Sequence, residues 1–211
     1  MSDSEPTAAR GVGIASGAGA PTAGEAPQWL SGPIDTRAGV VLHVRPLGRG
    51  DVARERRFAE GLSPESLRQR LLGAITGASD EQFARLVEPG WPRRLALAVV
   101  RRAGDDAAGD DAAGDDAAGD EEILGVARFD ACEQADAAEF AIVIADAWQR
   151  KGLGHALFER LLQAVRAAGY RDLIGVTFAD NRNMVELARA HGFEVGPEPG
   201  ERGLRRLTLR L

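Results

Sequence analysis

The sequence is short of the residues that support disulfide frameworks, nucleic-acid interfaces and membrane spans. It has one cysteine, Cys132, so no disulfide can form within the chain, as is usual in a reducing cytosol. Aromatic residues make up 5% of it, and no basic stripe is interleaved with them, which argues against nucleic-acid binding. No apolar run approaches the roughly 20 residues of a membrane helix, and the N-terminal MSDSEP lacks the basic and apolar regions of a secretory signal. We therefore expect a cytoplasmic protein with neither a nucleic-acid nor a membrane partner.

Lysine is scarce too, because Lys151 is the only one among 26 basic residues, while the formal net charge is −6. The acidic excess comes from one stretch, since residues 103–122 hold nine acids and no base. Without this stretch 23 acids remain against 26 bases, a net charge of +3. Within it DDAAG occurs three times, which predicts a self-repelling, length-tolerant insertion in a hairpin. The alternative is that the acidic stretch attracts a basic partner.

The composition divides the chain into a tail and one domain. Residues 1–37 are rich in Gly, Ala, Ser, Thr and Pro, and they cannot bury enough apolar surface to offset the entropy of ordering. We expect them to be a disordered tail, in which Trp29 and Leu30 are the side chains suited to dock onto the domain. Residues 38–211 then form one domain, which is long enough to bury a core without disulfides.

The hydrophobic pattern predicts an α/β fold with a mixed sheet. Alternating or continuous apolar segments predict strands at residues 40–47, 94–102, 123–130, 139–146, 173–180 and 204–211. Periodic segments and capping residues predict helices at residues 51–62, 63–75, 80–87, from 153 onward, and 181–193. The second and third strands flank the acidic insertion as a hairpin, and we expect the most apolar strand, 139–146, to be central.

Two glycines one residue apart, Gly152 and Gly154, open the helix that follows this apolar strand. The first turn of a helix has unpaired amide N–H groups and a partial positive charge, and glycine lets an anion approach the backbone closely. The arrangement therefore predicts a site for a phosphate or pyrophosphate. It is not the GxxxxGK[ST] loop of nucleotide triphosphatases, and Leu157 stands where the Rossmann fingerprint requires a third glycine.

Several motifs together resemble the GNAT-type N-acetyltransferase superfamily over residues 40–211. Gln149 and the two glycines form the pattern Q/R-x-x-G-x-G/A, and Asn181 precedes a Gly-Phe pair by 11 residues. Four segments are similar to the catalytic domain of bacterial protein lysine acetyltransferases, which modify acyl-CoA synthetases: RPLGRGD, FAEGLSPESLRQR, SDEQFARL and AEFAIVIADAWQRKGLG. The resemblance implies a mixed, mostly antiparallel sheet flanked by helices, with splayed central strands, and acetyl-CoA as co-substrate.

The resemblance also implies which residues bind acetyl-CoA. Its pyrophosphate would lie against the loop and first helical turn formed by Gln149, Arg150, Lys151, Gly152, Leu153, Gly154 and His155. Its pantetheine arm would contact main-chain groups of the strand residues Ile142, Val143 and Ile144, together with Asn181, which also suits a helix N-cap. A tyrosine that serves as general acid in many members is replaced here by Ala188. The histidines show no metal-ligand spacing, so we expect no metal.

Glu139 is the candidate general base. A lysine amine is roughly 0.1% neutral at physiological pH, so its attack on a thioester requires a group that takes up its proton. Glu139 stands at the head of the apolar strand, where we expect burial to make a carboxylate a stronger base. In the lysine acetyltransferases that the sequence resembles, a glutamate on this strand has that role.

The sequence therefore predicts an acetyl-CoA-dependent N-acetyltransferase that works by direct attack of the acceptor amine. A protein lysine is the expected acceptor, and an acyl-CoA synthetase is a candidate for the protein that carries it. One alternative acceptor is a small amine. The other alternative is a non-catalytic sensor that binds acyl-CoA.

Overall fold

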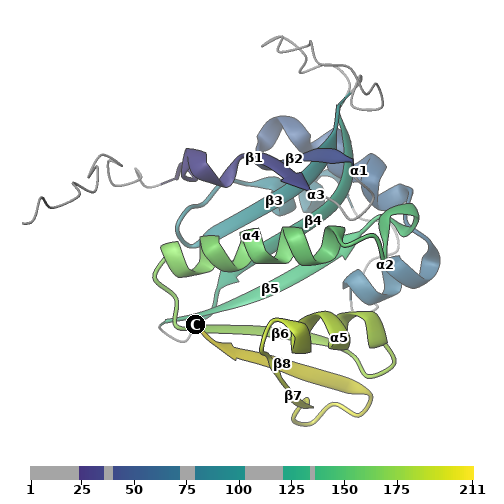
Figure 1. The fold of residues 1–211 in the computed structure, drawn as a ribbon, viewed down its shortest axis with the longest axis vertical. Coiled ribbons are helices and arrows are strands. Elements are labelled where there is room, and N and C mark those ends of the chain that lie inside the picture. The colour runs from purple at the N-terminus through teal and green to yellow at the C-terminus, as the bar shows by residue number, and fades with distance from the viewer. Residues whose placement is uncertain (1–23, 36–39, 72–78, 103–120, 134–135) are drawn as a thin grey trace, which may run out of the picture.

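Helices cover both faces of one sheet, because its interior strands carry apolar side chains on both sides (Figure 1). The computed structural model describes residues 24–35, 40–71, 79–102, 121–133 and 136–211. The strands are β1 (Gly32–Asp35), β2 (Val41–Pro46), β3 (Arg94–Arg101), β4 (Glu122–Ala131), β5 (Ala137–Ile144), β6 (Asp172–Phe178), β7 (Glu194–Pro197) and β8 (Leu204–Arg210). The α-helices are α1 (Val52–Glu60), α2 (Pro64–Leu71), α3 (Asp80–Val87), α4 (Leu153–Ala167) and α5 (Arg182–Ala190). Short 3-10 turns are η1 (Gln28–Leu30), η2 (Arg49–Asp51) and η3 (Asp146–Trp148).

The strands lie in the order β1-β2-β3-β4-β5-β6-β8-β7. Every neighbouring pair is antiparallel except β5 and β6, which are parallel and are joined through α4. The expected mixed, mostly antiparallel sheet is thus confirmed, as is the hairpin of β3 and β4. Within the described part of the chain, no helix is both long and apolar enough to cross a membrane.

Two strands were not predicted, and one of them corrects the tail boundary. Residues 24–35 form η1 and β1 rather than a disordered tail, and β1 pairs with β2 along its whole length. Leu30 is fully buried, and Arg160 on α4 donates to the carbonyls of Trp29 and Leu30 at 3.2 Å. The expectation of disorder for residues 1–23 lies outside the described residues. The second missed strand is β7, which makes β8 an interior strand.

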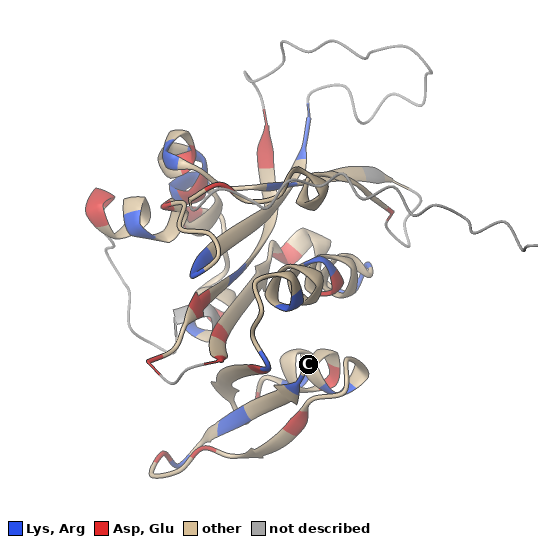
Figure 2. Ribbon diagram, turned by 90° about the vertical axis from the view of Figure 1, so that its left-hand side faces the viewer, with Lys and Arg blue, Asp and Glu red and all other residues tan. Residues whose placement is uncertain are grey.

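The acidic insertion is also shorter than expected at its C-terminal end. Glu122 already belongs to β4, and Glu121 accepts a hydrogen bond from Nε of Arg45 at 2.8 Å. Arg101 pairs with Glu122 at 2.5 Å and Arg102 with Glu121 at 3.3 Å, so acidic and basic residues face each other at these ends of β3 and β4 (Figure 2). The repeat itself, residues 105–119, lies outside the described residues.

The two faces of the sheet pack against different helices. The face toward α4 and α5 holds the larger buried cluster, in which all the periodic apolar residues of α4 take part. The opposite face holds a smaller cluster with side chains from α1, α3, β3 and β4, including Phe58, Val87, Ala98 and Val126. Side chains alternate along a strand, so each face can be followed by register from strand to strand.

Candidate active site

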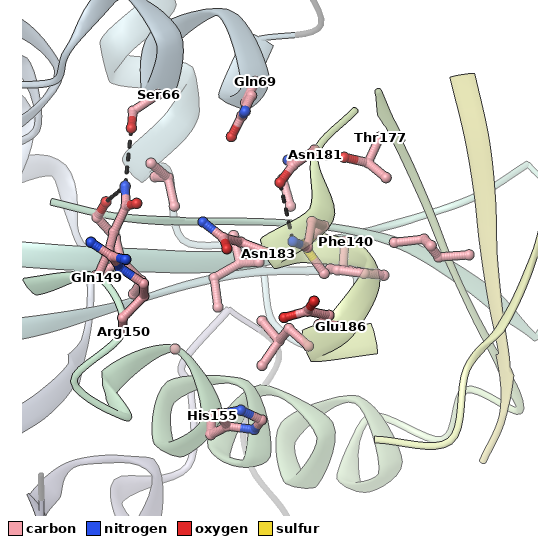
Figure 3. A pocket seen from close by; sticks show the side chains of 18 of the residues that line it. Ser66, Gln69, Phe140, Gln149, Arg150, His155, Thr177, Asn181, Asn183 and Glu186 are labelled. Carbon is pink, nitrogen blue, oxygen red and sulfur yellow. Dashed lines mark hydrogen bonds between the residues drawn. The ribbon is translucent and has the colours of Figure 1, made fainter. Parts of the chain in front are cut away.

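A cavity of about 510 Å³ opens where β5 and β6 separate. Side chains from α2, from the loop after η3, from the first turn of α4 and from α5 complete its wall (Figure 3). Most residues predicted for the site line it, namely Glu139, Ile142, Val143, Ile144, Gln149, Arg150, Gly152, Gly154, His155 and Asn181. The fold therefore brings three predicted parts of the site together: the glycine loop (residues 149–155), the apolar strand β5 and Asn181.

Where β5 and β6 separate, main-chain N–H and C=O groups of β5 face the opening and form no hydrogen bonds to β6. The parallel pairing covers only the three residues from Ala137 to Glu139. On the other side of β5, the N–H of Ala145 donates to the Leu124 carbonyl and the Ala137 carbonyl accepts from Cys132. Because backbone groups alternate in direction along a strand, odd-numbered residues of β5 bond to β4 and even-numbered ones face β6.

This alternation refines the prediction for the apolar strand. Ile142 and Ile144 direct main-chain groups into the opening, as expected, and Phe140 does so as well. Val143 directs its main-chain groups to Val126 on β4, so only its side chain is available to the cavity. The strand edge from Phe140 to Ile144 can therefore accept an extended polar chain as an additional strand.

Phe140 lies at the point where the two strands separate. Its ring lies over Gly175 of β6, where an added Cβ would come within 2.5 Å of the ring. On its other sides the ring packs against Phe158 and Phe193, with centroids 5.0 and 5.4 Å away. The ring thus occupies the space that a side chain at position 175 would need, immediately after the last β5–β6 pair, Glu139 and Ile174, and we call it the wedge.

The glycine loop has the form expected for an anion site at a helix N-terminus. Gly152 is the N-cap of α4 with φ of 85°, a left-handed conformation that favours glycine. Arg150 has φ of 60° and lines the cavity. A Cβ at Gly154 would lie 3.8 Å from Ile144 and 3.9 Å from Leu187, which the protein itself would tolerate. The glycine at 154 therefore keeps the cavity open next to the amide groups of the first turn.

Two predicted residues of this loop do not line the cavity. The ammonium group of Lys151 lies 5.1 Å from the ring centroid of Trp148, a cation–π geometry. Leu153 is fully buried in the larger cluster, so only its backbone N–H can act at the helix N-terminus. Arg150 is thus the basic side chain that the loop directs to the cavity.

Asn181 caps α5, as predicted. Its Oδ1 accepts from the N–H of Met184 at 3.1 Å, and its Nδ2 donates to the hydroxyl of Thr177 at 3.1 Å (Figure 3). The side chain is buried and lines the cavity. An amide nitrogen carries two hydrogens, so Nδ2 retains one for a ligand.

The sequence did not indicate that α2 would form a wall of the cavity. Gln149 donates to the hydroxyl of Ser66 at 3.0 Å and to the carbonyl of Ile144 at 3.1 Å (Figure 3). Asp146 accepts from the backbone N–H and the hydroxyl of Ser63 and from the hydroxyl of Ser66, at 2.9, 2.7 and 2.7 Å. Partial burial alone would raise the pKa of the Asp146 carboxyl, but these hydrogen bonds outweigh it and hold the pKa below its usual value.

The other side of α2 contacts the opposite wall. Arg68 reaches Asp180 at 3.1 Å, and its guanidinium lies 4.2 Å from the ring centroid of Phe178. The helix therefore bridges the two strands where they separate, and Ser66 and Gln69 face the cavity. Ser63 caps the start of α2, since its hydroxyl accepts from the Ser66 N–H at 3.2 Å, but a cap is a local feature and does not show what a helix packs against.

Glu139 lines the cavity, but the expectation that it is buried is wrong. Its side chain is exposed, because β5 and β6 begin to separate at this residue. It lies in register with Asp130, on the same face as Val143, which packs against the smaller cluster. The carboxylate therefore approaches the cavity from the face covered by α1, α2 and α3.

Two other reactive side chains, Cys132 and Tyr170, are not among the residues that line the cavity. Burial, and next the charge of Glu139, raise the pKa of the Cys132 thiol, which agrees with an inert residue. Tyr170 packs edge-on against Phe129 at 5.7 Å and is not among the lining residues, so it does not replace the tyrosine missing at Ala188. Across the described ranges, no group of three or more His, Cys, Asp and Glu side chains is arranged to hold a metal ion.

The sequence and the fold are both similar to those of known proteins. The family model described as "Acetyltransferase (GNAT) family" matches residues 81–193. "Acetyltransferase PA5475" from Pseudomonas aeruginosa is 30% identical over 188 residues, which cover 88% of this chain and 91% of that protein. The GNAT domain of S. lividans PAT superposes with a TM-score of 0.73 at 25% identity and covers 89% of this chain and 100% of that one.

A GNAT acetyltransferase from Streptococcus pneumoniae shares the fold, with a TM-score of 0.58 and 18% identity over 81% of this chain and 99% of that one. The family model and the Pseudomonas relative agree with the glycine loop and the open strand edge, which suit the phosphates and the pantetheine arm of acetyl-CoA. This chain belongs to the GNAT family and is an acetyl-CoA-dependent N-acetyltransferase.

Proposed function

We propose that the chain acetylates lysine side chains of proteins, with Glu139 as the general base. The observation that carries the proposal is that Glu139 and the glycine loop line one cavity. The glycine loop leads into α4, which together with α5 covers one face of the sheet, here called the donor face. The side chain of Glu139 lies on the opposite face, which α1 to α3 cover and which is here called the acceptor face. An amine that enters the cavity from the acceptor face would meet the carboxylate of Glu139 at the cavity wall.

The residues of the donor face would bind and orient the co-substrate. Acetyl-CoA supplies an activated acetyl thioester when it is bound. Amide N–H groups of the first turn of α4 offer partial positive charge to its phosphates, and the side chain of Arg150 offers a full positive charge. The open edge from Phe140 to Ile144 and the second hydrogen of Asn181 Nδ2 would hold the pantetheine arm. Gln149 fixes the Ile144 carbonyl and thereby the end of this edge.

On the acceptor face, Glu139 would take up the proton of the attacking amine. Its exposure in the structure leaves it accessible to an incoming lysine, and filling of the cavity would then displace its water. Glu186 lines the same cavity from α5. The two carboxylates favour an acceptor that arrives as a cation, as a lysine does at neutral pH.

The name of the S. lividans PAT structure and the segments similar to protein lysine acetyltransferases support a protein acceptor. The polar wall formed by Ser66 and Gln69 of α2 lies where a peptide chain around the lysine would rest. A small amine and a non-catalytic acyl-CoA sensor are the other outcomes of the test.

The test measures CoA release from acetyl-CoA by the purified protein, with and without cell lysate, alongside the acetyl-lysine content of lysate proteins. The proposal expects lysate-dependent release with new acetylated proteins. Release without new acetylated proteins would indicate a small amine, and binding of acetyl-CoA without release would indicate a sensor.

Replacement of the general base gives the first prediction. Glu139→Gln should lower turnover by about 10²- to 10⁴-fold, because a carboxamide cannot accept the proton, while CoA affinity stays within about twofold. Glu194→Gln is the matched control, because Glu194 is an exposed glutamate on β7 outside the cavity. Turnover that falls equally in both variants, or in neither, would remove Glu139 from the mechanism.

A further inference from the structure

Two histidines from different helices meet beside the cavity. His155 lies in the first turn of α4 and lines the cavity (Figure 3), and His191 directly follows α5. Nδ1 of His155 and Nε2 of His191 are 3.2 Å apart, with ring centroids at 5.3 Å. His191 also packs edge-on against Phe158 at 5.1 Å. The pair thus joins the N-terminus of α4 to the end of α5.

A hydrogen bond between two imidazoles needs one nitrogen with a hydrogen and one without. If Nε2 of His191 donates, Nδ1 of His155 is the acceptor, and the single hydrogen of a neutral His155 is then on its Nε2. If His155 becomes the imidazolium, its Nδ1 donates to His191 and its Nε2 still carries a hydrogen. In the reverse neutral tautomer His155 donates from Nδ1 to His191 and its Nε2 has no hydrogen. A phosphate next to Nε2 therefore favours the first two states, in which Nε2 of His155 is a donor.

The surroundings keep His191 uncharged at neutral pH. Burial is the main cause that lowers the pKa of His191, the charge of His155 lowers it further, and Glu159 acts in the opposite direction. A charged His191 facing a charged His155 would place two N–H groups against each other and break the pair. The pair therefore takes up at most one proton while it remains bonded.

We propose that His191 is a positioning residue that holds the His155 ring with its Nε2–H directed to the phosphate groups of acetyl-CoA. This inference rests on the proposed placement of acetyl-CoA at the glycine loop. The backbone amides of that loop cannot be replaced by substitution, whereas the histidine pair is a side-chain contribution to phosphate binding that single substitutions can remove.

The pair also makes the affinity for CoA depend on pH. A phosphate next to His155 favours the state with one extra proton, so affinity should fall as the pH rises through the titration of the pair. The other charged groups here are Glu159 on α4, Glu186 on α5 and Arg150 before α4. The two carboxylates favour the proton, and Arg150 opposes it.

The test compares His191→Phe, which keeps the packing on Phe158, with His191→Gln, whose amide can replace the lost Nε2. CoA affinity is measured by calorimetry between about pH 6 and about pH 8. Pantetheine, which lacks all the phosphates, is titrated by NMR on the same proteins. The matched control is His43→Gln on β2, the third histidine of the chain, which does not line the cavity. Ring-nitrogen NMR reports whether Nε2 of His155 carries the hydrogen.

We expect His191→Phe to weaken CoA binding about three- to tenfold, to flatten its pH dependence and to leave pantetheine binding unchanged. His191→Gln should recover most of the affinity. Equal weakening of CoA and pantetheine, or unchanged CoA affinity in a folded His191→Phe protein, would overturn the inference alone. Failure of the wild-type protein to bind CoA would overturn both the inference and the proposed function.

Discussion

The donor and acceptor faces of the sheet are held together by different kinds of contact. On the donor face, Phe140, Phe158 and Phe193 pack with centroids 5.0 to 5.6 Å apart, within the larger buried cluster. On the acceptor face the buried cluster is smaller, and polar contacts supplement it. There Arg128 donates to the fully buried Glu55 at 2.9 Å, and Asp51 bonds to Arg45 at 2.7 Å.

This difference matches the two tasks of a transferase. Close apolar packing fixes positions through shape, which suits a co-substrate whose structure never changes. Polar contacts between helix and loop exchange more easily with water, so α2 can adjust to different acceptors at small cost. The comparison predicts that substitutions on the donor face change stability most, and that those on the acceptor face change the behaviour of α2.

The largest expected effect comes from truncating matched leucines on the two faces. Leu157→Ala on the donor face should lower the free energy of unfolding by about 4 kcal/mol, because the residue is fully buried between α4 and the sheet. Leu62→Ala on the acceptor face should cost about 2 kcal/mol, because its surroundings can collapse more easily. Urea unfolding measures both values. An equal or reversed order would break the comparison.

The wedge between β5 and β6 gives the next largest effect. Gly175→Ala places a methyl group against the Phe140 ring, which Phe158 and Phe193 hold in place, so we expect a loss of about 1–3 kcal/mol. CoA affinity should fall with it, because the ring sets the opening of the strand edge. Gly196→Ala on β7 is the control, since an added Cβ there meets no atom within 4 Å. Thermal unfolding measures the stability of both variants, and calorimetry measures their affinity for CoA. A Gly175→Ala protein that is as stable as the wild type and binds CoA equally well would contradict the prediction.

The smallest effect concerns the contact between α2 and Asp146. Asp146→Asn should speed hydrogen exchange in α2 without a large change in global stability, because an amide NH₂ cannot accept from Ser63. The folded state holds the pKa of Asp146 below its ordinary value of 3.8, so the carboxylate stabilises the contact above that pH and the stabilisation is lost as the pH falls further.

Wild-type α2 should therefore loosen as the pH is lowered from about 5 to about 3, and the Asp146→Asn protein should show less of this change. The pKa of Glu65 is also held low, by its hydrogen bond from Arg68, but Glu65 is the same in both proteins, so the difference between them isolates Asp146. Identical pH profiles of exchange would show that Asp146 does not control α2.

The sequence could predict those parts of the site whose geometry depends only on residues close together in the chain. The glycine loop, the cap at Asn181 and the apolar strand follow from a few neighbouring residues. The wedge could not be predicted, because Phe140 and Gly175 are ordinary strand residues until the fold places one over the other. The exposure of Glu139 and the position of α2 depend in the same way on distant partners.

The two missed strands have a similar explanation. β1 has the sequence GPID, and proline and glycine there resemble a loop, although an edge strand tolerates both. β7 is EVGP, four residues that also sit at an edge of the sheet. Neither segment has an alternating pattern long enough to be recognised without its partner.

The first of these strands has a practical consequence for preparing the protein. A shortened chain that begins at residue 38, where the composition places the domain boundary, would lack β1. The backbone groups of β2 that pair with β1 would then be open to water. An open strand edge of this kind pairs readily with a second molecule, so the shortened protein should self-associate and precipitate. Retaining the chain from residue 24 keeps β1 in place, and with it the buried Leu30 and the contacts of Arg160.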